Sequence, residues 1–253
     1  MNKTRVIPVL LLRGQGLVKT IKFKNPIYIG DPINSVRIFN EKEVDELIFL
    51  DIYAAREGRG PDFDILSDIA GEAFMPMAYG GGISNINQIE KIFTLGFEKV
   101  VINSSSYNNL DLILNASKKF GSQSIVGCVD VHRTLLGRYE LYSNGGKIKQ
   151  SKSLIDHVIS LERQGVGEII VNAIDRDGTQ SGYDLKMVSE VARSVKVPVV
   201  ACGGAGSLEH MSLVVREAGA TAVAAGSFFV FVGPHRAVLI NYPSREKLAQ
   251  FLP

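Results

Sequence analysis

The two halves of this 253-residue chain resemble each other, and this internal repeat constrains the fold more than any other feature. The segment PMAYGGGISNINQIEKIFTLGFEKVVINSSS resembles PVVACGGAGSLEHMSLVVREAGATAVAAGSF at an offset of 122 residues, so that Pro76 corresponds to Pro198. At the same offset, Glu46 in DELIFLDI corresponds to Glu168 in GEIIVNAI. A repeat of about half the chain predicts two similar structural halves and a site with approximate twofold symmetry.

Apolar, strand-like runs alternate with amphipathic segments of helical length along the chain. Eight strands are predicted, at residues 6–12, 47–52, 75–79, 99–103, 124–131, 168–173, 197–202 and 222–225. Near-continuous apolar runs separated by helices indicate a parallel sheet that is covered on both faces. Eight such units predict one (β/α)8 TIM barrel domain over residues 1–253, with an internal twofold half-barrel repeat. An open doubly wound sheet is the alternative, weakened because no GxGxxG motif follows the first strand.

Composition and charge exclude several classes of partner. The net charge is only +2, from 28 basic and 26 acidic residues without a basic block, so nucleic acid is not expected as a partner. The run VIPVLLL is too short to span a membrane, and the protein is expected to be cytoplasmic. Cys128 and Cys202 lie in apolar runs without metal-ligand spacing, which favours buried free thiols. We expect no metal and no cofactor.

Two glycine-rich turns, GGGIS at 80–84 and GGAGS at 203–207, each end a strand and precede a helix. Glycine lets backbone N–H groups approach an anion, and a helix amino terminus adds favourable partial charge. Two such turns on opposite sides of a barrel mouth predict a ligand with a phosphate at each end, whereas tight strand-to-helix turns are the plainer explanation. The predicted phosphate-binding residues are Gly81, Gly82, Gly203, Gly204, Gly226 and Ser227, with NSSS from Asn103 joining the first turn.

Carboxylates at the carboxyl ends of barrel strands suit general acid–base chemistry. Asp130 is the strongest catalytic candidate, because a carboxylate inside an apolar strand needs a compensating role. Asp51 and Asp175 could equally bind loop N–H groups, and Asp177 follows close behind Asp175. The longest loops, at 13–30, 53–61 and 132–149, are expected at this end, and Lys19 in the first could contact a phosphate or only solvent.

A second set of charges is expected at the other end of the barrel, where the strands begin. It comprises two cations and two anions: Arg5, Glu46, Lys99 and Glu168. Charges on this face ordinarily stabilise a barrel through ion pairs. A ring of balanced charge could also plug or gate the barrel axis.

Several motifs together resemble the cyclase subunit of imidazole glycerol phosphate synthase. They span nearly the whole chain: GDPI (30–33), YGGGI (79–83), FGSQSIVG (120–127), AIDRDGTQSGYD (173–184) and ACGGAGSLEH (201–210). The resemblance implies a (β/α)8 barrel that pairs with a class I glutaminase subunit. Ammonia from glutamine would cross the barrel and react with a phosphoribulosyl aminoimidazole carboxamide nucleotide, which carries two phosphates. The products would be imidazole glycerol phosphate and an aminoimidazole ribotide.

The resemblance also assigns roles to single residues. Asp130 matches one of the family's two catalytic aspartates. The positions that match its site-lining residues are Lys19, Asp51, Asn103 and Asp177. The positions that match its ammonia gate are Arg5, Glu46, Lys99 and Glu168. The other catalytic aspartate falls on Leu11, which the internal repeat aligns with Asp130 at an offset of 119.

Leucine cannot accept or donate a proton, so the acid–base pair lacks one member. The loop at 13–30 and the closing GSFFVFVGPHRAVLINYP also differ from a standard cyclase. This pattern is similar to cyclase-like paralogues of the acetamidino-sugar, surface-polysaccharide type. We therefore expect an ammonia-conducting subunit that serves a third enzyme, one that amidates a nucleotide-linked sugar. The alternatives are a working cyclase of histidine biosynthesis and a non-catalytic phosphate-binding scaffold.

Overall fold

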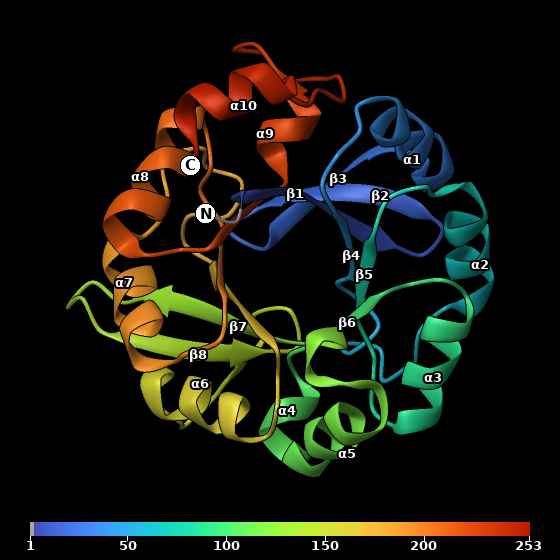
Figure 1. The fold of residues 1–253 in the computed structure, drawn as a ribbon, viewed down its shortest axis with the longest axis vertical. Coiled ribbons are helices and arrows are strands. Elements are labelled where there is room, and N and C mark those ends of the chain that lie inside the picture. Colours follow the sequence, from blue (N-terminus) through green and yellow to red (C-terminus); the bar gives the residue numbers. More distant parts are fainter. Residues whose placement is uncertain (1–2) are drawn as a thin grey trace.

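The computed structural model describes residues 3–253 as a closed barrel of eight parallel strands (Figure 1). Each strand pairs with its neighbours in parallel, and β12 closes the barrel on β1. In order around the barrel, the strands are β1 (Arg5–Arg13), β4 (Leu47–Asp51), β5 (Met77–Gly80), β6 (Lys99–Ile102), β7 (Ile125–Arg133), β10 (Glu168–Ala173), β11 (Val199–Cys202) and β12 (Ala222–Ala225). The prediction of a (β/α)8 barrel with eight strands is confirmed.

Helices surround the barrel and cover the outer face of its sheet (Figure 1). The eight longer ones are α1 (Pro32–Glu41), α2 (Phe63–Glu72), α3 (Ile86–Thr94), α5 (Leu110–Phe120), α6 (Leu154–Arg163), α7 (Leu185–Ser194), α8 (Leu208–Ala218) and α10 (Arg245–Phe251). Three short turns of helix complete the set: α4 (Ser105–Asn108), α9 (Ser227–Val230) and the 3-10 turn η1 (Ser122–Ser124). Within residues 3–253, none of these helices is long and apolar enough to cross a membrane.

Alternate residues of each strand face the helices or the barrel axis. Along β1, Val6 and Leu10 pack in the outer core beneath the helices, whereas Ile7 and Val9 pack inside the barrel. The inner core also takes one or two apolar residues from each other strand: Ile48, Ala78, Val101, Val126, Cys128, Ile170, Val200, Ala222 and Ala224. The same period of two places Arg5 at one end of the barrel axis and Leu11 at the other, about 20 Å away at ~3.3 Å per residue.

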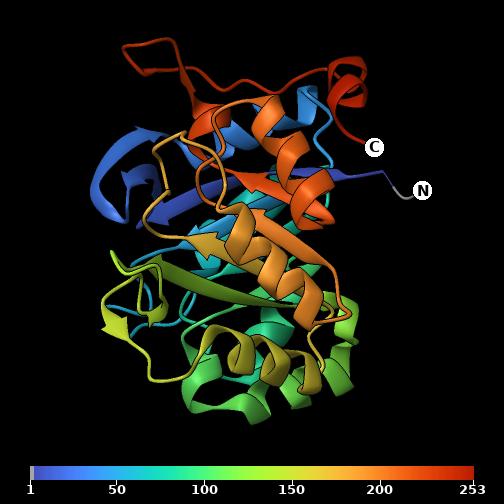
Figure 2. The same ribbon diagram turned by 90° about the vertical axis from the view of Figure 1, so that its left-hand side faces the viewer.

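Two of the expected loops contain antiparallel strands instead. β1 extends past the barrel rim and pairs with β2 (Gly16–Ile21), which pairs with β3 (Lys24–Gly30). β7 likewise extends to pair with β8 (Tyr139–Ser143), followed by β9 (Ile148–Lys149). A third hairpin, β13 (Phe231–Val232) with β14 (Ala237–Val238), follows β12. All three project from the end of the barrel at which its strands finish (Figure 2).

The predicted twofold repeat is visible in the topology. β1 and β7 are four strands apart in either direction, so they face each other across the barrel. Each is a nine-residue strand with an antiparallel hairpin partner, which its neighbours lack. Leu11 and Asp130, aligned by the sequence repeat, therefore occupy equivalent positions on opposite walls.

Candidate functional site

Four charged side chains form a closed ring at the end of the barrel where the strands begin. Each acid contacts both cations: Lys99 Nζ lies 2.9 Å from Glu46 Oε1 and 3.1 Å from Glu168 Oε2, and Arg5 pairs with both carboxylates. Burial lowers the pKa of Arg5, but Glu168 and Glu46 raise it by more, so the guanidinium stays charged. The four residues predicted for this face thus come together as a neutral ring.

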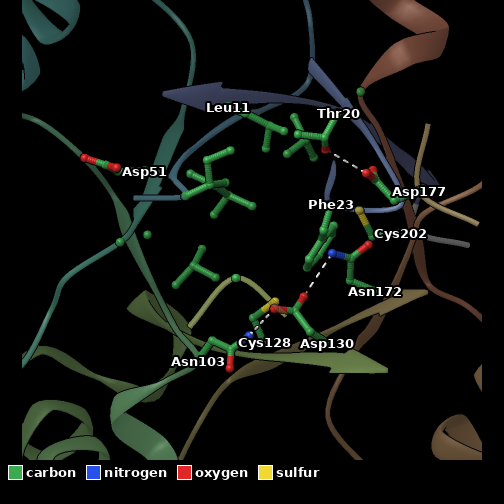
Figure 3. Close-up of a pocket in the computed structure, with 18 of the residues that line it drawn as sticks. Leu11, Thr20, Phe23, Asp51, Asn103, Cys128, Asp130, Asn172, Asp177 and Cys202 are labelled. Carbon is green, nitrogen blue, oxygen red and sulfur yellow. Dashed lines mark hydrogen bonds between the residues drawn. The ribbon is translucent and has the colours of Figure 1, made fainter. Parts of the chain in front are cut away.

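A pocket opens at the opposite end of the barrel, where the strands finish (Figure 3). All the residues predicted for catalysis and for substrate or phosphate binding line it: Lys19, Asp51, Gly81, Gly82, Asn103, Asp130, Asp177, Gly203, Gly204, Gly226 and Ser227. Asp175, the remaining carboxylate considered, does not belong to this lining, and its Oδ1 accepts a hydrogen bond from the backbone N–H of Arg133. Between the ring and the pocket lies the apolar inner core.

Two asparagines hold the carboxylate of Asp130 (Figure 3). Asn103 Nδ2 donates to Asp130 Oδ2 over 2.8 Å, and Asn172 Nδ2 donates to Oδ1 over 3.0 Å. Burial raises the pKa of Asp130 to about 7, although both amide hydrogen bonds lower it. At neutral pH the group can therefore accept or donate a proton, which is what general acid–base chemistry requires.

The opposite wall of the pocket is apolar at the equivalent positions. Leu11 on β1 pairs in register with Leu50 on β4, as Asp130 on β7 pairs with Asn172 on β10. Leu50 corresponds to Asn172 at the repeat offset of 122, and Ala225 corresponds to Asn103. The pocket thus has a polar half that can exchange a proton and an apolar half that cannot. No second carboxylate faces Asp130 from β1.

The carboxylate of Asp51 serves the loop that follows β4. Its Oδ1 accepts hydrogen bonds from the backbone N–H groups of Tyr53 and Ala54, each over 3.0 Å, and its Oδ2 lies 2.8 Å from Arg59 Nη1. Figure 3 shows Asp51 at the margin of the pocket, far from Asp130. Of the two roles considered for Asp51, this geometry favours holding the loop.

Lys19 and Asp177 both line the pocket, and the ammonium group of Lys19 lies beside Gly226. Lys19 belongs to β2 rather than to a loop, and its Nζ donates to the carbonyl oxygen of Val9. Burial lowers the pKa of Lys19 to about 8. Asp177 Oδ2 accepts a hydrogen bond of 2.9 Å from Thr20 Oγ1, and burial raises the pKa of Asp177. The hydrogen bond between Thr20 and Asp177 ties the first hairpin to the loop after β10.

The two glycine turns have matching packing. A Cβ at Gly81 would lie 2.6 Å from the carbonyl oxygen of Asp51, and one at Gly203 would lie 2.7 Å from that of Ala173, the equivalent residue. Gly82 and Gly204 are also in the left-handed region, with φ of 67° and 108°. Tight strand-to-helix packing therefore explains these four glycines by itself. The four glycines also line the pocket, so their binding of an anion there stays a proposal.

Comparison with known proteins identifies the family. The pattern of the histidine biosynthesis protein family matches residues 5–233. "Putative imidazole glycerol phosphate synthase subunit hisF2" of Pseudomonas aeruginosa is 52% identical over 98% of this chain and 99% of its own. The chain belongs to the HisF-like family. A HisF of Leptospira interrogans is 47% identical over 97% of both chains, and hisF3 of Vibrio vulnificus is 47% identical over 96% of this chain and 94% of its own, both again named "Putative imidazole glycerol phosphate synthase subunit".

Sequence reasoning missed the polar residue of this HisF-like site that holds Asp130 from β10. Asn172 is buried and binds Asp130 directly, yet it was not a predicted site residue. The signal was present in GEIIVNAI, where an asparagine interrupts an apolar strand at the position that DELIFLDI fills with leucine. A buried amide needs hydrogen-bond partners, so this asparagine pointed to a polar neighbour.

Proposed function

We propose that this HisF-like barrel is the ammonia-conducting subunit of a glutamine-dependent amidotransferase and that its own cyclase chemistry is lost. A glutaminase subunit of the HisH type would supply ammonia to the charged ring. The ammonia would cross the barrel and leave by the pocket, where a third enzyme would use it to amidate a nucleotide-linked sugar. The observation that carries this proposal is Leu11 opposite Asp130, with the ring at the other end complete.

The barrel axis supports the conduit. The inner core between ring and pocket is apolar and contains three alanines, Ala78, Ala222 and Ala224. An uncharged molecule such as ammonia loses little solvation there, whereas an ammonium ion would lose most of its hydration energy. The path therefore favours the neutral, nucleophilic form.

The pocket argues against efficient cyclase chemistry. In the family that this chain resembles, two aspartates share the acid–base work, and here only Asp130 remains. Removal of a general acid or base commonly reduces a rate by about two to four powers of ten. Leu50 and Ala225 extend the apolar wall at the positions equivalent to Asn172 and Asn103, so the strands next to Leu11 supply no amide of the kind that holds Asp130.

The relatives support membership of a HisF-like group but leave the acceptor open. Two of them carry the numbered names hisF2 and hisF3, and the names of all three mention no sugar acceptor. The amidated sugar is our proposal for the acceptor.

An active cyclase is the second candidate. Asp130 keeps a pKa near neutrality, and Lys19 lies beside Gly226, where it would contact one phosphate of a bisphosphate ligand. On this alternative, the chain would convert the phosphoribulosyl nucleotide and ammonia to imidazole glycerol phosphate and an aminoimidazole ribotide, with Asp130 and another acid of the pocket carrying the reaction.

One assay separates the two candidates. The purified chain is given an ammonium salt and the phosphoribulosyl aminoimidazole carboxamide nucleotide, and imidazole glycerol phosphate is measured. We expect turnover at least about a hundredfold below that of a working cyclase, because one proton-transfer group is absent. Turnover within a few fold of a working cyclase would reject the proposal. In a second reaction, the chain, its glutaminase and a sugar-amidating enzyme should together amidate a nucleotide-linked sugar from glutamine.

A further inference from the structure

The exposed apolar residues of this barrel are concentrated on one face. Of the eleven large hydrophobic side chains that are exposed in residues 3–253, nine lie in the segments 13–30, 132–150 and 231–239, which we call the mouth hairpins. The nine are Ile21, Ile27, Tyr28, Leu135, Leu136, Ile148, Val232, Val238 and Leu239. At the tip of the second hairpin Leu135 is fully exposed and Leu136 is 84% exposed. Large exposed apolar side chains that gather in a few segments at one end of a molecule are typical of an interaction site.

The mouth hairpins are also strongly basic. They contain nine lysines and arginines and one acid, Glu140, whereas the rest of the chain has nineteen basic and twenty-five acidic residues. Five of the cations are exposed and form no ion pair within the described part of the chain: Arg13, Lys22, Lys24, Arg138 and Lys147. These charges are dispersed in the sequence, and the fold brings the hairpins that carry them to the end of the barrel at which the pocket opens (Figure 2). The resulting field would attract an acidic surface.

The hairpins are anchored to the pocket walls. Arg236 Nη1 in the third hairpin donates to the carbonyl oxygen of Gly178 over 3.0 Å, and Arg56 Nε donates to that of Asn144 in the second over 3.2 Å. Lys22 N–H in the first donates to the carbonyl oxygen of Asp177 over 2.9 Å.

In the described residues β3 pairs only with β2, so its outer edge, beside Ile27 and Tyr28, is open for strand pairing.

We infer that the mouth hairpins form the docking surface for the enzyme that accepts the ammonia, and that this enzyme presents acidic side chains around an apolar patch. The inference rests on the proposed function. A small anionic ligand would need cations pointing into the pocket, but it would not need leucines at a hairpin tip that points away from it. An acceptor seated on these hairpins covers the pocket opening, so ammonia passes to it without entering bulk water.

The test uses the chain in complex with its glutaminase and the purified sugar-amidating enzyme as the probe, with binding measured by biolayer interferometry. The double variant Leu135→Asp/Leu136→Asp should weaken binding at least about tenfold, as loss of an apolar anchor does. The pair Lys24→Glu/Arg138→Glu should slow association and reduce its dependence on salt. Leu213→Asp on α8 and Lys186→Glu on α7, on the outer wall, are the matched controls and should bind as the wild type does.

Activity gives the second readout. The leucine variant should lose glutamine-dependent amidation by the same factor and keep amidation from added ammonium salt. Wild-type amidation with undiminished binding by both hairpin variants would overturn the docking surface alone. Absence of any binding by the wild-type complex would overturn the docking surface together with the proposed function. Binding of single-stranded RNA through the same hairpins, in place of the enzyme, would also overturn the inference that they dock the acceptor enzyme.

Discussion

At the scale of single residues, the pocket combines a proton-exchanging wall with an inert one. Asp130 is held by Asn103 and Asn172, whereas Leu11 is paired with Leu50. An aspartate placed at position 11 by itself would therefore lack the amide donor that Asp130 has on the next strand. A buried carboxylate without such donors is costly, and its pKa rises further.

We therefore expect cyclase activity to return more fully in Leu11→Asp/Leu50→Asn than in Leu11→Asp alone. The single variant should be destabilised by roughly 1–3 kcal/mol, and the second change should recover part of that loss through a hydrogen bond. Turnover with the phosphoribulosyl nucleotide and ammonium salt is the measurement, and Leu11→Asn is the control, because it has the polarity without the acid. If neither aspartate variant forms product, departures outside β1 also disable the cyclase.

The buried acid predicts a pH dependence of stability. Its pKa is about 7 in the folded protein and near 4 when unfolded, so the folded state binds the extra proton and loses stability as pH rises from about 4 to about 7. Asp130→Asn removes this loss of stability, because the new side chain does not titrate. The amide of Asn103 or Asn172 can rotate so that its oxygen accepts a hydrogen bond from the amide at position 130. The variant should gain roughly 2–4 kcal/mol over the wild type at pH 8 and little at pH 4. Urea denaturation at several pH values measures this, and an equal gain at both would contradict it.

At the scale of elements, the alternation along each strand explains why the sequence predicted the charged ring, the apolar core and the pocket of the barrel. The period of two puts Arg5, Ile7, Val9 and Leu11 on the inner face of β1, so ring, core and pocket could be anticipated together. The antiparallel hairpins could not be anticipated as easily. Lys22 and Phe23 form a two-residue turn with positive φ at both positions, where glycine or asparagine is the usual signal. The turn between β8 and β9 does carry such a signal, in Asn144–Gly145–Gly146, but β9 has only two residues.

The charged ring should contribute to stability as a unit. Among the residues that the structure describes, Lys99→Met leaves Glu46 and Glu168, both buried, paired with Arg5 alone. Loss of one partner from a buried network costs roughly 3–5 kcal/mol, whereas Lys119→Met, which breaks an exposed pair with Glu90, should cost less than about 1 kcal/mol. Chemical denaturation of the two variants tests this difference. If glutamine-dependent amidation is also unchanged in Lys99→Met, the ring is structural and does not act as a gate.

At the scale of the whole molecule, the first and last segments of the chain lie side by side (Figure 1). The backbone N–H of Thr4 donates to the carbonyl oxygen of Pro253 over 3.1 Å, and Tyr242 Oη donates to that of Val6 over 2.9 Å. The boundary between the half-barrels lies near η1, on the surface of the barrel. The repeat in the sequence predicted this twofold plan, but it could not show that residues 4 and 253 would meet.

A circular permutant should therefore fold. Residue 253 is joined to residue 3 by a short glycine–serine linker, and new termini are opened within η1. Because the ends already touch and the opening falls between the halves, the permutant should melt in one cooperative transition within about 10 °C of the wild type. Circular dichroism follows the melt. A permutant opened inside β7, which breaks the barrel wall, is the control and should not fold cooperatively.

The leucine pair on β1 and β4 has a further consequence for how this chain can evolve. Leucines at positions 11 and 50 carry no desolvation cost, whereas a buried acid and an amide partner there would, so the apolar wall also stabilises the barrel. Making that wall polar would require two substitutions, and the first alone is unfavourable. A barrel of two similar halves can thus keep proton chemistry on one wall while the other wall serves stability.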